Sequence, residues 1–191
     1  MSNDFRIPVQ PIRKLIRDIV FDIKSDYKNP RKIVYEYVNA GFGSNFDLEI
    51  ILNKGKDFDK KFLKPYDIEA FWDDDTNTLE IFLNIDSKAD TSFFYDLIGD
   101  LNDILFHELT HKKQYERGDR IPNRRITKPE KYYTQEHELE AQIAGFKRKS
   151  KLSRVPLEMV MRNYFNKRRE KYNLTDKIID RIVNRLLNYG N

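Results

Sequence analysis

The chain contains no cysteine among its 191 residues, which excludes a disulfide framework and a cysteine-ligated metal site. Any metal ion must therefore be held by histidine, aspartate or glutamate side chains. Histidine is scarce as well, with three in the whole chain, so few places in the sequence can supply imidazole ligands.

Long apolar runs are also missing. No segment approaches the ~20 consecutive apolar residues that a membrane-spanning helix needs. Residues 1–13 mix charged side chains with two prolines and lack the apolar stretch of a secretion signal. We therefore expect no membrane association and a cytoplasmic location.

The net charge of +4 conceals an asymmetry along the chain. Residues 1–146 carry 22 Lys and Arg against 27 Asp and Glu, whereas residues 147–191 carry 13 against 4. A basic C-terminal tail can bind an anionic partner such as nucleic acid, and the alternative is that these charges form an ordinary solvated helix face.

Apolar periodicity predicts helices over residues 7–27, 30–40, 91–117, 135–149, 156–171 and 174–188. Alternating apolar residues predict a strand over 47–52 and a hairpin over 67–86. The hairpin turn, Asp73 to Asn77, is acidic but lacks the glycine and the terminal glutamate of a calcium-binding loop. Gly118 is expected to end the helix 91–117, before a polar connection over 119–134.

These elements indicate an α+β protein. We expect a mostly helical domain with a small antiparallel sheet over residues 1–150. A basic helical extension over residues 151–191 would pack on or next to that domain.

The segment from His107 through Glu108 to His111 carries the clearest chemistry. Four residues advance ~400° around a helix, so both imidazoles lie on one face, where their nitrogens can reach one ion at ~2.0–2.1 Å. Glu108 lies ~100° away from His107 and can instead reach a water in the open position of the metal. Metal-assisted peptide hydrolysis needs this division between ligands and general base.

Two histidines leave such a site incomplete, because catalytic zinc normally has three protein ligands. The helix predicted over 135–149 offers His137, Glu138 and Glu140. Glu138 and Glu140 flank the apolar face on opposite sides, so both cannot be ligands. His137 could be a ligand, could donate a hydrogen bond to an oxyanion, or could simply be exposed. Periodicity leaves this choice open.

The HExxH segment followed by Glu138-Leu139-Glu140-Ala141 resembles the gluzincin branch of the zincin metallopeptidases. It is closest in style to short bacterial and phage-encoded members, and the resemblance covers residues 97–142. It implies a zinc ion held by His107, His111 and Glu138, with Glu108 as general base.

The same resemblance also implies roles for residues outside the ligand set. Gln142 stands where the family commonly has an aspartate that bonds a ligating imidazole. Strand 78–85 would lie beside the cleft and pair with an extended substrate. Tyr132 and Tyr133 are candidate hydrogen-bond donors, or else pack the connecting segment. A metzincin site is excluded, because residues 112–117 contain no glycine and no further histidine.

We therefore expect a zinc-dependent metallopeptidase, a hydrolase that acts on a protein or peptide substrate. The alternative is a zincin-fold structural protein, such as a phage virion or assembly component, with a non-catalytic metal site. A phage-encoded protein would work in the host cytoplasm or the virion. Nucleic acid could bind the basic tail, whose clustered basic residues include Lys147, Arg148, Lys149, Lys151, Arg154, Lys167, Arg168, Arg169 and Lys171.

Overall fold

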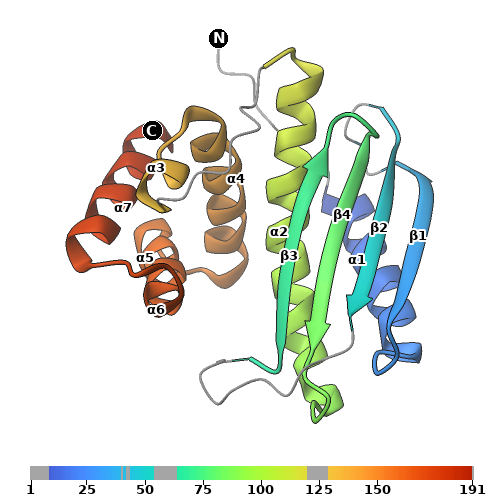
Figure 1. Ribbon diagram of the computed structural model, residues 1–191. Coiled ribbons are helices and arrows are strands. Elements are labelled where there is room, and N and C mark those ends of the chain that lie inside the picture. Colours follow the sequence, from blue (N-terminus) through green and yellow to red (C-terminus); the bar gives the residue numbers. More distant parts are fainter. Residues whose placement is uncertain (1–8, 40, 42–43, 54–63, 120–128, 191) are drawn as a thin grey trace. The chain divides into compact units, whose positions relative to one another are not determined.

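The computed structural model describes residues 9–39, 41, 44–53, 64–119 and 129–190 (Figure 1). Residues 1–8 of the expected N-terminal segment and residues 120–128 of the expected polar connection lie outside this range. Contacts divide the chain into two compact units, which we call unit 1 (1–113) and unit 2 (114–191). The domain boundary at residue 150 stays a prediction, because the compact units are defined by contacts alone and do not establish where a domain ends.

Unit 1 contains a four-stranded sheet in the order β1-β2-β4-β3. Its strands are β1 (Arg31–Val38), β2 (Phe46–Asn53), β3 (Tyr66–Asp73) and β4 (Thr78–Ile85). The α+β class is confirmed, but the sheet is mixed and not antiparallel as expected, because β2 and β4 run in the same direction. The predicted hairpin is present as β3 and β4, which pair antiparallel around a turn at residues 74–77.

Residues 31–38 form the strand β1, so the helix predicted over 30–40 is wrong. The segment is rich in β-branched and aromatic residues, which favour a pleated strand over a helix. Ile33 and Tyr35 pack against the core. An irregularity between Tyr35 and Val38, with Tyr37 at a positive φ of 53°, interrupts the alternation and hides the strand period in the sequence.

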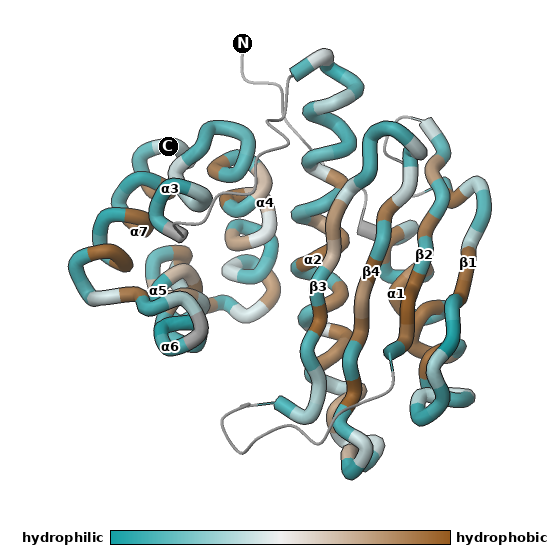
Figure 2. The backbone as a smooth tube through the Cα atoms, in the orientation of Figure 1, coloured by the Kyte–Doolittle hydropathy of each residue, from teal (hydrophilic) through white to brown (hydrophobic). Residues whose placement is uncertain are grey.

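The core of unit 1 lies between the sheet and two helices, α1 (Val9–Ser25) and α2 (Phe94–Glu116), on one face (Figure 1). Alternate residues of β2 and β4 point into this core, and Figure 2 shows the apolar positions along these strands and α1. α1 contributes isoleucines at helical spacing. The fully buried members of this set are Ile12, Ile19, Ile23, Leu48, Ile50, Leu79, Ile81 and Leu83.

Unit 2 is helical apart from its connections. After the last turn of α2 come α3 (Pro129–Tyr133), α4 (Glu136–Ser153), α5 (Leu157–Lys167), α6 (Arg169–Tyr172) and α7 (Asp176–Gly190). α4, α5 and α7 share one apolar core, which includes Leu139, Met161, Phe165, Ile182 and Leu186. The Thr175 hydroxyl accepts a hydrogen bond from the Ile178 amide and so caps the start of α7.

None of the described helices has both the length and the apolar character that a membrane crossing needs.

Candidate metal centre

α2 is the helix that carries the HExxH segment. A capping residue precedes it, and a glycine follows its last turn. Asp90 accepts a hydrogen bond from the Ser92 amide at 2.8 Å, just before the short helix η1 (Thr91–Phe93) that leads into α2. At the other end Gly118 adopts a φ of 81°, as predicted for a C-terminal stop. Between them a stripe of fully buried leucines packs into the core of unit 1: Leu97, Leu101, Leu105 and Leu109.

His107 and His111 lie one turn apart on another face of α2. Their Nε2 atoms are 3.1 Å apart, and the ring planes meet at 86°. Two ligand atoms of a tetrahedral zinc ion at ~2.05 Å would be ~3.3 Å apart. The two nitrogens therefore already stand at nearly the separation that one shared ion requires, as the sequence spacing predicts.

Glu108 lies between the two histidines in the sequence. It is buried, with 7% of its surface exposed. Its Oε1 lies 3.8 Å from the Nε2 of His107. That distance is too long for a hydrogen bond, yet it keeps the carboxylate within one water molecule of the ligand nitrogens. The position is suited to a general base that acts on a metal-bound water.

Glu138 lies in the first turn of α4 and is 4% exposed. Burial raises the pKa of its carboxyl to about 7, and a hydrogen bond with the Tyr132 side chain acts in the opposite direction. A neighbouring cation would favour the ionised carboxylate, because it offsets the cost of burying that negative charge. The surroundings of Glu138 therefore suit a metal ligand.

His107, His111 and Glu138 form a group that could hold a metal ion. Each offers one ligand atom, and these atoms all lie within 4.8 Å of one another. Two imidazole nitrogens and one carboxylate oxygen are a donor set that transition metals such as zinc and iron accept. The residues present therefore fit a bound transition-metal ion.

Glu140 and His137, the other candidates for the third ligand, have different surroundings. Burial raises the pKa of Glu140, but hydrogen bonds from Arg117 and Gln114 outweigh this and leave the pKa below its ordinary value. Burial lowers the pKa of the His137 imidazole, whose Nε2 lies 3.7 Å from Glu138 Oε1. Within the described part of the chain, the metal-binding group includes Glu138 and neither of these two.

The remaining sequence predictions have mixed outcomes. Tyr133 packs in the core of unit 2 against Phe165, with ring centroids 5.0 Å apart, so its packing role is confirmed. Gln142 is buried, and its bond to a ligating imidazole stays a prediction. The expected pairing of strand 78–85 with a substrate is wrong, because β4 is flanked on both sides by β2 and β3.

Three residues near the HExxH segment were not predicted from the sequence. Gln114 is fully buried and bonds α4, while Arg117 forms an ion pair with Glu140. Lys112 is 1% exposed and its Nζ donates to the Ser44 hydroxyl at 3.0 Å. Gln114 had a detectable signal, since it follows His107 by seven residues and so lies on the face of the ligands. Lys112 had a similar signal, since it follows Leu105 by seven residues and so lies on the face of the buried leucines.

No family model matches the chain, and no curated protein or solved structure matches it significantly. The resemblance to gluzincins rests on the motif residues within 97–142. The finding that the structure adds is the group of His107, His111 and Glu138, which is able to hold a metal ion.

Proposed function

We propose that this protein is a zinc-dependent metallopeptidase. The observation that carries the proposal is the group of His107, His111 and Glu138, together with a buried carboxylate, Glu108, beside it. This combination supplies three ligands and a separate base, which are the parts that metal-assisted hydrolysis of a peptide bond requires.

Zinc is preferred here over other metals for two reasons. A site of two imidazoles and one carboxylate is poor in oxygen for magnesium or calcium, which favour sites made almost wholly of oxygen ligands. Ferrous iron also accepts this donor set. Glu108 favours zinc over iron, because a general base next to the ligands serves hydrolysis.

The roles of the residues follow from their positions. His107, His111 and Glu138 would hold the ion through two nitrogens and one oxygen. When bound, zinc would act as a Lewis acid that lowers the pKa of a water and polarises the substrate carbonyl. Glu108 would take the proton from the attacking water and later give it to the leaving amine. The substrate is a protein or a peptide.

The first test separates metal binding from hydrolysis by the substitution Glu108→Gln. We expect purified wild-type protein to contain one zinc per chain and to cleave casein or a pool of quenched fluorescent peptides. Glu108→Gln should keep the zinc and lose cleavage by ~10²–10⁴-fold, since the base is removed and the ligands remain. Metal content is measured by elemental analysis, and cleavage by fluorescence.

Glu116→Gln is the matched control, because it removes the same charge from an exposed position near the end of the same helix. It should cleave like the wild type. If the zinc-loaded wild type cleaves nothing, or if Glu108→Gln is equally active, the peptidase proposal is wrong. A stable zinc content without cleavage would instead support the structural or assembly protein with a non-catalytic metal site.

A further inference from the structure

Gln114 lies on the same face of α2 as the two histidine ligands. It follows His111 by three residues and His107 by seven, so the three side chains form one stripe along the continuous helix. Gln114 is fully buried. A buried amide is costly unless its donors are satisfied, so its hydrogen-bond partners show what the side chain holds in place.

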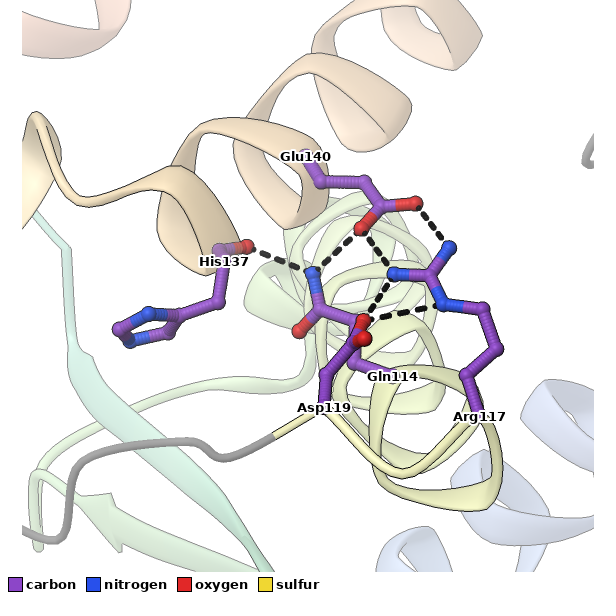
Figure 3. A network of polar contacts seen from close by, with 5 residues as sticks. All are labelled: Gln114, Arg117, Asp119, His137 and Glu140. Atoms are coloured by element: carbon purple, nitrogen blue, oxygen red, sulfur yellow. Dashed lines mark hydrogen bonds and ion pairs between the residues drawn. The ribbon is translucent and has the colours of Figure 1, made fainter. Parts of the chain in front are cut away.

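The Gln114 amide nitrogen donates hydrogen bonds to two groups in the first turns of α4 (Figure 3). Nε2 donates to the backbone carbonyl of His137 at 2.8 Å and to Oε2 of Glu140 at 2.8 Å. The His137 carbonyl belongs to the peptide unit that joins His137 to Glu138. Because that peptide unit is planar and includes the Cα atom of Glu138, a bond to its oxygen also restrains the position of Glu138.

Arg117 reinforces this arrangement from the end of α2. Its Nη1 and Nη2 bond the two oxygens of Glu140 at 3.0 and 2.8 Å, a bidentate pair (Figure 3). Its Nε also donates to Asp119 at 2.9 Å. The positive φ of Gly118 turns the chain so that the Asp119 amide bonds the Gln114 carbonyl, which brings Asp119 back beside the guanidinium.

The network explains why Glu138, and not Glu140, belongs to the metal group. Two residues advance ~200° around an α-helix, so the two carboxylates leave α4 in nearly opposite directions. Glu140 is committed to Gln114 and Arg117 on one side. Glu138 is thereby presented on the other side, in the group with His107 and His111.

We infer that Gln114 and Arg117 are positioning residues for the metal centre, which hold the first turns of α4 so that Glu138 completes the ligand set. The inference rests on the proposed metal site and adds residues that never touch the metal. Its energetic basis is preorganisation, because a ligand held in place before binding loses less conformational entropy when the ion arrives.

The test uses full-length protein and two probes, zinc and cobalt(II). Zinc affinity is measured by competition with a chromophoric chelator, and the cobalt absorption spectrum reports the coordination geometry. We expect Gln114→Met, which keeps the size but removes the donors, to weaken zinc binding by ~10–100-fold and to change the cobalt spectrum. Arg117→Ala should weaken zinc binding by about 10-fold, and Arg117→Lys should restore part of the loss.

Gln10→Met makes the same substitution at an exposed position of α1 and should leave both readings unchanged. If wild-type affinity and the wild-type cobalt spectrum persist in both Gln114→Met and Arg117→Ala, this inference is overturned while the metal site stands. If the wild type itself binds neither metal, the proposed function fails first. Arg117 is exposed, so Arg117→Ala decides the matter even if Gln114→Met does not fold.

Discussion

Glu138 and Glu140 are two carboxylates in the same helix whose surroundings give them different roles. Burial dominates at Glu138 and raises its pKa, whereas the guanidinium of Arg117 and the amide of Gln114 stabilise Glu140 as an anion. A bound cation would therefore stabilise the ionised carboxylate of Glu138 more than that of Glu140. Sequence position alone does not distinguish the two.

This difference gives a prediction for the two alanine variants. Glu138→Ala should weaken zinc binding by more than ~100-fold, because it removes a ligand and exceeds the usual effect of a residue outside the ligand set. Glu140→Ala should weaken it by about 10-fold, because the ligand remains but is held less firmly. Chelator competition measures both. A larger loss from Glu140→Ala would assign Glu140 as the ligand.

At the scale of the element, α2 has two distinct faces. The leucine stripe packs into the core of unit 1, and the stripe of His107, His111 and Gln114 carries the ligands and their support. Lys112 continues the leucine stripe, because it follows Leu105 by seven residues, and its Nζ lies 5.9 Å from the centre of the Trp72 ring and bonds Ser44. A charged side chain in this position connects α2 to Trp72 of β3 and to Ser44, two residues before β2, within unit 1.

Lys112 should therefore contribute to the stability of unit 1. We expect Lys112→Ala to lower the free energy of unfolding by ~2–4 kcal/mol, because it leaves a cavity where the long side chain packed. Lys112→Met should cost less, since it fills the same space and buries no charge. Urea denaturation followed by tryptophan fluorescence reports on the right place, because Trp72 is the single tryptophan of the chain.

Lys113→Ala is the control for this measurement, as it makes the same change at the next residue, which is less buried. Its effect should stay within ~0.5 kcal/mol. Equal effects at positions 112 and 113 would mean that the burial of Lys112 contributes nothing.

For the whole molecule, the basic C-terminal tail is partly neutralised by its own structure. Arg162 bonds Glu158 at 2.8 Å and Asp180 at 2.6 Å, and Arg169 pairs with Asp176. Hydrogen bonds to both carboxylates raise the pKa of Arg162. A simple count of charges would make these arginines available to an anionic partner, but carboxylates of the tail already pair with them. The exposed Lys151 and Arg154, at the end of α4, are better placed to meet one.

We propose nucleic acid as such a partner and expect a labelled 20-base single-stranded DNA to bind at low salt. The affinity should fall with rising salt, because bound phosphates release counterions. The double substitution Lys151→Glu and Arg154→Glu should weaken binding and reduce the salt slope by ~1 for each lost phosphate contact. Fluorescence anisotropy measures both quantities.

The control pair is Lys14→Glu and Arg17→Glu, which places the same charge reversal on an exposed face of α1. It should change the affinity less than the α4 pair. An absence of binding at low salt would exclude this partner, and equal effects of both pairs would mean that the tail has no special role.

Much of the secondary structure was predictable because it depends on local pattern. The helices α1, α2, α4 and α7 follow apolar periodicity, and the hairpin of β3 and β4 follows alternation around a turn. β1 was misassigned because its irregularity near Tyr37 breaks the alternation. The parallel pairing of β2 with β4 could not be predicted, since neighbours in a sheet are set by contacts distant in the sequence.

By itself the sequence determined the pair of histidines and the base between them. Helical spacing is a local property, so His107 and His111 had to share a face of any helix formed there. Only the tertiary structure separated Glu138 from Glu140 and His137, because that choice depends on which side chains Gln114 and Arg117 reach. Those contacts join residues more than 20 positions apart, and periodicity carries no information over that distance.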